Sequence, residues 1–205
     1  MDAIMMFIRQ AGIFIYPILG GALWALVLLV ERAIFYLQTA SRLTKQSAEF
    51  RAILIREGFE KASTYIAAQK GILRNVLLSA LSNGKLPVER IEEKMGLVVM
   101  KELPEYQKYL NLIAVLAGLM PMLGLLGTVS GMIVLFKVIA LRGTGDAQAM
   151  ADGISQALLT TEAGLVAAIP IILGHVLLTN RLNKITAKTK EVCLATIDYL
   201  KEPHA

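Results

Sequence analysis

Three long apolar runs dominate the hydrophobic pattern of the chain, and charged segments separate them. The runs cover residues 11–30, 110–136 and 154–179. A helix that crosses the hydrocarbon core of a bilayer needs roughly 20 predominantly apolar residues, so each run is long enough for one crossing. The pattern predicts an all-α integral membrane protein with three transmembrane helices.

The first run could instead belong to a secretory signal, which has a basic start, a short apolar centre and a small-residue cleavage site. Before residue 11 the only charged side chains are those of Asp2 and Arg9, and the apolar run is too long for a signal. We therefore expect a retained membrane anchor.

The segment between the first two runs, residues 38–109, mixes charges with apolar residues at helical spacing. It predicts two helices joined by a turn at residues 82–84, with Pro87 at the first position of the second helix. The apolar face of that helix continues toward the second run. We therefore expect one long helix that extends from the membrane into a helical bundle, with a bend at Pro104.

The tail, residues 181–205, carries an apolar stripe that could pack on this insert. The stripe consists of Leu182, Ile185, Val192 and Tyr199. With no internal repeat and no low-complexity segment, residues 1–205 are expected to form a single domain.

Composition and charge add an orientation to this picture. The chain is 56% apolar and carries a net charge of +5, and its basic residues concentrate in the insert and the tail. Basic segments beside membrane helices stay in the cytoplasm, so the insert and tail are predicted to be cytoplasmic and the N-terminus periplasmic. Binding of nucleic acid is the weaker interpretation of the charge. Cys193 is the only cysteine, so it is expected to be an inert cytoplasmic thiol.

Small residues gather on one face of the second run. On a helical wheel of about 100° per residue, the face within about 60° of Thr128 is smooth. It is formed by Ala114, Ala117, Pro121, Gly124, Gly131 and Leu135. Small faces in membranes serve close helix packing, and this run alone does not distinguish packing from the lining of a polar lumen.

The third run has a similar arc, which is small or polar throughout. It contains Gly153, Gln156, Ala157, Thr160, Thr161, Ala163, Gly164, Ala167 and Ala168. Counted at about 1.5 Å per residue from the ends of the two runs, the hydroxyls of Thr128 and Thr161 are predicted to lie at similar depth. Several copies around an axis could then form a ring of hydroxyls.

Two motifs resemble the signature stretches of the MotA/TolQ/ExbB proton-channel family. They are residues 121–131, PMLGLLGTVSG, and residues 153–170, GISQALLTTEAGLVAAIP. The order of spans, insert and tail is also similar. Within the family the chain most resembles ExbB, because MotA subunits are longer and have four spans, while TolQ shares the three-span plan.

The resemblance implies a bacterial inner-membrane homopentamer around ExbD-like single-span helices, whose membrane aspartate carries the proton that energises a TonB-like protein. The family's pore threonines correspond to Thr128 and Thr161, and we place Thr160 and Gln156 on the same path. ExbB and TolQ proteins often have a glutamate where this chain has Gln156, so the role of that acid does not transfer. The remaining small residues form the predicted packing face: Pro121, Gly124, Gly131, Ala157, Gly164 and Ala168.

Glu162 is a carboxylate in the middle of the third run, on its bulky arc. Ionisable residues inside membranes are functional candidates by default, so Glu162 either carries protons or is a structural carboxyl, neutral or hydrogen-bonded to a neighbouring helix. The sequence contains no phosphate-binding loop, metal-ligand cluster or nucleophile with a base nearby, and we expect no enzyme, cofactor or metal. A TolQ-like subunit, a structural scaffold and a self-sufficient channel are the alternatives.

Overall fold

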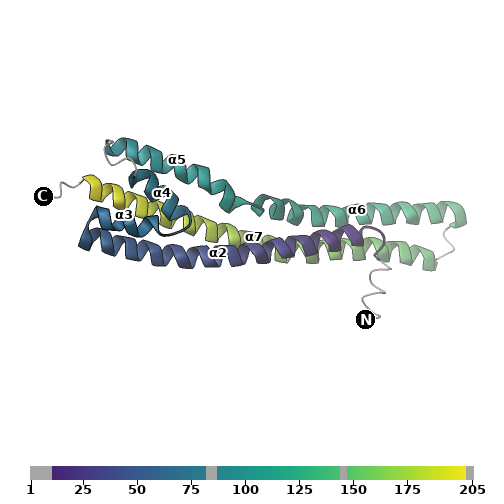
Figure 1. Cartoon of the computed structure of the whole chain (residues 1–205). Coiled ribbons are helices and arrows are strands. Elements are labelled where there is room, and N and C mark those ends of the chain that lie inside the picture. The colour runs from purple at the N-terminus through teal and green to yellow at the C-terminus, as the bar shows by residue number, and fades with distance from the viewer. Residues whose placement is uncertain (1–10, 82–86, 144–146, 202–205) are drawn as a thin grey trace. The chain divides into compact units, whose positions relative to one another are not determined.

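The computed structural model describes residues 11–81, 87–143 and 147–201, and they form helices and no strand (Figure 1). The helices are α2 (Ile15–Glu57), α3 (Phe59–Ala67), α4 (Ile72–Leu81), α5 (Val88–Gln107), α6 (Leu110–Arg142) and α7 (Ala147–Lys201). The all-α prediction is confirmed. The predicted turn at residues 82–84 lies outside the described residues.

Three of the helices, α2, α6 and α7, are long and apolar enough to cross a membrane, as the three apolar runs predict. Two of them are much longer than a membrane is thick, because α2 has 43 residues and α7 has 55. A crossing uses roughly 20 residues. Each of these two helices therefore has a long second part that is not needed for the crossing.

The chain divides into two compact units. The first consists of Met1–Glu31 and Tyr109–Leu177, and the second of Arg32–Lys108 and Leu178–Ala205. The boundaries fall inside α2 and α7 and between α5 and α6, and we describe each unit by itself.

The first unit packs the beginnings of α2 and α7 with α6, and its outer surface is apolar. Leu29 of α2 lies against Gly174, and Met120 of α6 lies against Gly21. On the outside, Leu125 is 62% exposed and Val166 is 65% exposed. Large apolar side chains on an outer surface are what lipid contact requires.

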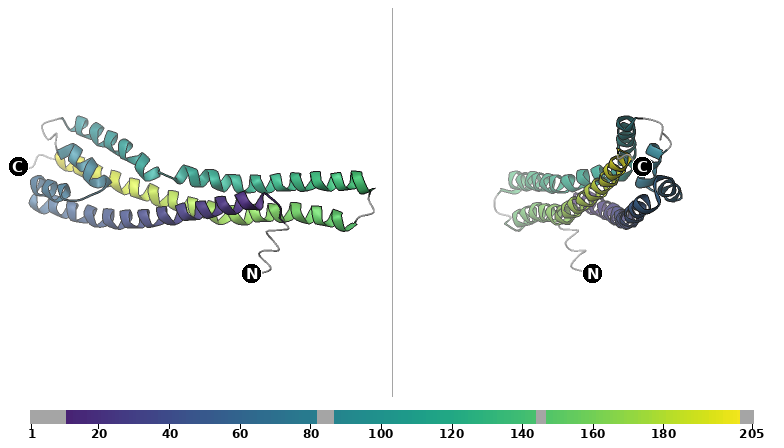
Figure 2. Two further views of the ribbon diagram at one scale, coloured as in Figure 1. Left: turned by 45° about the vertical axis from the view of Figure 1, so that its right-hand side comes forward. Right: turned by 90° about the vertical axis from the view of Figure 1, so that its left-hand side faces the viewer.

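Helices α3, α4 and α5 and the second parts of α2 and α7 form the second unit (Figure 2), and its core consists of large side chains. Tyr36, Phe50, Leu73, Leu77 and Met95 are fully buried. The tail stripe packs into this unit as predicted for its first three members, since Leu182, Ile185 and Val192 are buried and Tyr199 is half-buried.

The insert contains more helices than the two that the sequence pattern predicts. It holds the end of α2, then α3, α4 and α5. Gly58 and Gly71 separate the first three with φ angles of 85° and 109°, a backbone conformation that glycine adopts at little cost. These two glycines were the sequence signal for the additional helix ends.

The expected continuous helix from the insert into the second span is wrong. α5 runs through Pro104 and ends at Gln107, and α6 begins after Tyr109, which has a φ of 68°. Tyr106 fixes the end of α5 from both sides. Its carbonyl oxygen accepts a hydrogen bond from the hydroxyl of Tyr36 at 2.5 Å, and its own hydroxyl accepts one from the backbone N–H of Ile72 at 3.2 Å.

Candidate functional site in the membrane helices

Glycines bring the backbones of α6 and α7 into close contact in the first unit. A methyl group built on Gly124 would lie 3.0 Å from Cα of Thr161, and one on Gly131 would lie 2.8 Å from Cβ of Ala157. A methyl group on Gly164 would lie 2.6 Å from the carbonyl oxygen of Met120. Residue numbers fall along α7 as they rise along α6, so the two helices run antiparallel.

The predicted packing face lies largely inside this contact. Gly124, Gly131 and Gly164 are buried, Ala157 is 3% exposed and Ala168 is 1% exposed. Pro121, the remaining member, is half-buried. Much of the two small arcs therefore serves close packing within one chain, which small residues permit in a membrane because the backbones can approach.

Thr128 and Thr161 are both half-buried, and both hydroxyls are hydrogen-bonded. The Thr161 hydroxyl donates to the carbonyl oxygen of Gly124 at 2.9 Å, which links α7 to α6. The Thr128 hydroxyl donates to the carbonyl oxygen of Leu125 in its own helix at 2.6 Å. Because Gly124 contacts Thr161 and Gly131 contacts Ala157, Thr128 lies at the level of these α7 residues, in agreement with the expected similar depth.

Thr160 lies inside the first unit, where it is 1% exposed. Its hydroxyl oxygen lies 2.5 Å from the carbonyl oxygen of Ala11 and 2.8 Å from that of Gln156, and its methyl group packs against Gly127. A side chain buried within one subunit has no surface to offer to a lumen. In this conformation Thr160 therefore holds α7 to the start of α2 and does not belong among the lumen-facing residues.

Gln156 is half-buried, and its side-chain amide lies against Gly12 at the start of α2. Gly12 has a φ of 76°, and the position that a methyl group would take there is occupied by the Gln156 amide. The positive φ angle favours glycine at this position. The sequence pattern did not identify Ala11, Gly12 and Gly127 as contacts of the site. Gly127 escaped notice because it lies about 100° away from Thr128 on the wheel.

Glu162 lies on the outer side of α7, exposed among apolar side chains. Its neighbours Leu158 and Leu165 are 63% and 48% exposed. Within the described ranges Glu162 forms no hydrogen bond and no ion pair, so the structure gives no partner for it on another helix of this chain. A membrane carboxylate in this position needs a group from another molecule or must be neutral.

His175, Lys137 and Cys193 are further ionisable side chains of α6 and α7. His175 is half-buried, Lys137 is exposed, and Cys193 is buried. Across the described part of the chain no three His, Cys, Asp or Glu side chains are grouped so that they could hold a metal ion. The chemistry of the site is therefore that of two hydroxyls and an amide beside tightly packed helices.

Comparison with known proteins identifies the same family that the two motifs resemble. The sequence profile described as the MotA/TolQ/ExbB proton channel family matches residues 68–191, which is more than half of the chain and includes both motifs. The biopolymer transport protein exbB1 of Vibrio cholerae is 24% identical over 204 residues, covering 98% of this chain and 88% of that protein.

Two further relatives show how much of the chain is similar to an ExbB-named protein and to a TolQ-named protein. A Synechocystis sp. protein named biopolymer transport protein ExbB-like 3 is 31% identical over 166 residues, with 79% of this chain and 78% of that protein covered. The Tol-Pal system protein TolQ of Haemophilus influenzae is 33% identical over 91 residues, but these are 44% of this chain and 40% of that protein. The similarity to these two ExbB-named proteins thus covers more of the chain than the similarity to TolQ does.

Proposed function

Because the chain belongs to the MotA/TolQ/ExbB proton channel family, we propose that it is the helical subunit of an inner-membrane motor that uses the proton motive force to act on a TonB-like protein. Within the family it is most like ExbB. The chain is a multi-pass membrane protein, and its family consists of proton-channel subunits. This family is not a known enzyme class.

The arrangement of the two threonine hydroxyls is the observation that supports this proposal best. Each hydroxyl donates its hydrogen to a backbone carbonyl, so its oxygen still has lone pairs that can accept a hydrogen bond. No carboxylate lies on the two small arcs. A proton that moves along a lumen lined by these arcs must therefore be carried by a titratable group of another chain.

The partner that fits is an ExbD-like protein with a single membrane helix and an aspartate within it. When this aspartate is protonated, its O–H can donate to the oxygen of Thr128 or Thr161; when it is ionised, water beside the same hydroxyls can solvate it. Gln156, which lies against Gly12, adds an amide on the same path. Five copies of the chain surround the partner's helices.

Proton flux into liposomes tests this mechanism. The subunit alone should be tight, and flux should appear only when the one-span partner is present. A hydrogen bond to a charged group is worth about 1.5 to 3 kcal/mol, so Thr128→Val and Thr161→Val should each slow flux by roughly ten- to a hundredfold while the complex stays assembled. Thr44→Val is the matched control, because its hydroxyl also bonds a carbonyl of its own helix, that of Ala40, outside the membrane run.

Three results would contradict the mechanism. Substantial flux through the subunit without its partner would show that the proton carrier belongs to this chain. Unchanged flux in both valine variants would leave the threonines as packing residues. A complete lack of flux with every tested partner would favour the structural scaffold instead.

Glu162 gives a separate test, because it is exposed on the opposite side of α7 from the contact with α6. We expect Glu162→Gln to lower coupled activity more than it lowers the amount of assembled complex, since the amide keeps the shape but cannot exchange a proton. Full activity of this variant would make Glu162 a structural side chain at a contact with another molecule.

Orientation and copy number are also part of the proposal. The basic insert and tail are cytoplasmic and the N-terminus is periplasmic. Cysteines introduced at Ser63 and at Thr144, which lies outside the described residues, should then label oppositely with an impermeant reagent. Labelling of the Ser63→Cys variant from outside intact cells would reverse the orientation. Native mass spectrometry should show a pentamer, and a dimer or monomer as the largest species would contradict it.

A TolQ-like role in the cell envelope is the second candidate, favoured by the similarity to the Haemophilus influenzae protein over 91 residues. The two roles differ in the client protein. Co-purification of the detergent-extracted complex with a TonB-like or a TolA-like protein from the same cell, and the genes beside this one, distinguish them.

A further inference from the structure

Two cations in the second unit share one open pocket and form no ion pair with any described residue. They are Arg42 of α2 and Lys70, which follows α3. Both line an open pocket of about 420 Å³, together with Gln46, Tyr65 and Gln69 among others. Both also line an adjoining crevice of about 190 Å³. The two hollows therefore adjoin at the pair of cations.

The single acidic side chain that lines the larger pocket is already engaged. The Glu49 carboxylate accepts a hydrogen bond from the Tyr65 hydroxyl and lies 4.0 Å from the Lys45 ammonium. The Tyr65 hydrogen bond and burial raise the pKa of Tyr65 to about 12, with burial the larger cause, so the phenol remains a donor at neutral pH. Arg42 and Lys70 are thus left without a counter-charge in this pocket.

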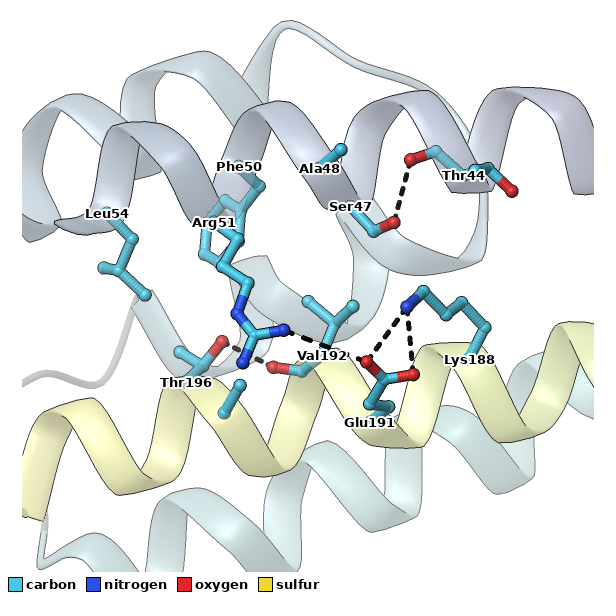
Figure 3. Close-up of a pocket in the computed structure, with 11 residues that line it drawn as sticks. Thr44, Ser47, Ala48, Phe50, Arg51, Leu54, Lys188, Glu191, Val192 and Thr196 are labelled. Carbon is cyan, nitrogen blue, oxygen red and sulfur yellow. Dashed lines mark hydrogen bonds and ion pairs between the residues drawn. The ribbon is translucent and has the colours of Figure 1, made fainter. Parts of the chain in front are cut away.

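A second pocket in the same unit contains cations that are paired with a carboxylate (Figure 3). It lies between α2 and α7, where Glu191 sits 2.9 Å from the Lys188 ammonium and 3.9 Å from the Arg51 guanidinium. Two cations face one carboxylate there. The pocket with Arg42 and Lys70 differs because these two cations lack a carboxylate partner among the described residues, which is the condition for binding an anion from outside the chain.

The crevice beyond the two cations is apolar on most of its lining. Phe35, Leu43, Ile72 and Leu73 contribute to it. Phe35, Thr39, Arg42 and Gln46 are spaced by four, three and four residues along α2, so they lie on one face of that helix. The combined hollow therefore has an apolar end and a basic end, arranged along the helix axis.

The position of this hollow along α2 corresponds to the edge of a membrane. The large apolar side chains exposed on α2 extend from Tyr16 to Leu37, and the next one on that helix is Ile55. Arg42 follows Leu37 by five residues, or about 7.5 Å of helix. Each polar headgroup layer of a bilayer is roughly 5 to 7 Å thick, so the guanidinium is placed to reach phosphate groups.

We propose that this hollow binds an anionic phospholipid of the adjacent leaflet. Its phosphate lies between the Arg42 guanidinium and the Lys70 ammonium, and its glycerol and first chain carbons lie against Phe35 in the crevice. Arg suits phosphate through paired N–H donors, and Lys adds a compact charge. The bound lipid would join α2 to the connection before α4, where Gln46 already donates to the carbonyl oxygen of Lys70 at 3.3 Å.

Native mass spectrometry of the full chain, purified in detergent and mixed with phosphatidylglycerol or phosphatidylcholine, tests this proposal. We expect wild type to retain phosphatidylglycerol in preference to phosphatidylcholine. Each basic residue near a membrane surface contributes about fivefold to the binding of anionic lipid. Arg42→Gln and Lys70→Gln should each weaken retention about fivefold, and the double variant about thirtyfold. Exchanging the two residues, Arg42→Lys with Lys70→Arg, should preserve most of the binding.

The matched control removes the same charge from the pocket of Figure 3, in the double variant Arg51→Gln with Lys188→Gln. It should leave lipid retention near the wild-type value. Equal losses in the two double variants would reduce the effect to net charge and overturn the site. Displacement of the lipid by an excess of inorganic phosphate, with no preference between the two lipids, would make free phosphate the ligand and would also overturn the proposal. Every variant must also elute as a folded oligomer in size-exclusion chromatography.

Discussion

The α6–α7 contact of the first unit and the core of the second unit bury different kinds of residue. In the first unit, α6 and α7 meet through Gly124, Gly131 and Gly164. In the second, the buried side chains include Phe50 and Leu77. The chain thus packs its helices in two different ways, and α2 and α7 each contribute to both units.

The surrounding solvent explains the difference. In water, burying a large apolar side chain stabilises a fold by roughly 1.5 to 3 kcal/mol, so the second unit gains from Leu, Phe and Tyr in its core. In lipid there is no such gain, because the acyl chains are as apolar as the side chains, and association depends on close packing and hydrogen bonds. The first unit accordingly has glycines where α6 meets α7 and many large apolar residues on its surface.

The largest effect on stability is expected in the core of the second unit. Leu77 is fully buried, and Leu77→Ala should lower the free energy of unfolding by about 2 to 5 kcal/mol. Unfolding in detergent, followed by circular dichroism, measures it. Leu97→Ala is the control, because Leu97 is 59% exposed and should change stability little. Similar losses from both substitutions would mean that this core does not depend on burial.

A smaller loss is expected when one methyl group is added to the first unit. In Gly164→Ala the new carbon would meet the Met120 carbonyl and Gly124, and overpacking of this kind costs about 1 to 3 kcal/mol. Gly118→Ala places the same methyl group in open space on α6, where it should be neutral or stabilising by up to about 1 kcal/mol. If both variants unfold alike, the glycines are not the reason that the helices approach.

The hydroxyl of Tyr106 should contribute about 1 kcal/mol. Tyr106→Phe removes the acceptor for the N–H of Ile72 and keeps the ring that stacks on Phe35 at 5.5 Å between ring centres. We expect faster hydrogen exchange at the start of α4 than in the wild type. Unchanged exchange at Ile72 would show that this bond does not hold α4 to α5.

The smallest effect concerns the pH dependence of the second unit. The pKa of Tyr65 is raised from 10.0 to about 12 by burial and then by its hydrogen bond to Glu49. A raised pKa in the folded state stabilises below the unfolded value, so this contribution is complete below pH 10 and is lost as the pH rises toward 12. Burial raises the pKa of Tyr106 as well, so phenolate absorbance should show late-ionising tyrosines, of which one is lost in Tyr65→Phe and shifted to lower pH in Glu49→Gln. No shift in the latter variant would remove Glu49 as a cause.

The apolar runs and their spacing were sufficient to predict the helical class and the three spans. A run of about 20 apolar residues has few alternatives to a membrane helix, because unpaired backbone groups are too costly in lipid. The family followed from the two motifs, since residues 121–131 and 153–170 contain the small-residue pattern that the packing of α6 on α7 requires. These properties depend on residues that are close together in the sequence, so the sequence pattern is sufficient to predict them.

Only the tertiary structure shows which side of each helix packs against which neighbour. A helical wheel gives the direction of each side chain but not the residues around it. Thr160 and Thr161 lie on the same predicted arc, yet the first is buried against Gly127 and the second bonds Gly124 at the edge of the contact. The break at Tyr109 depends on Tyr36 and Ile72, which are distant in sequence. The pairing of Arg42 with Lys70 in one pocket likewise needs α3 to return beside α2. Contacts between segments far apart in the chain have no signature in either segment alone, so only the folded chain contains them.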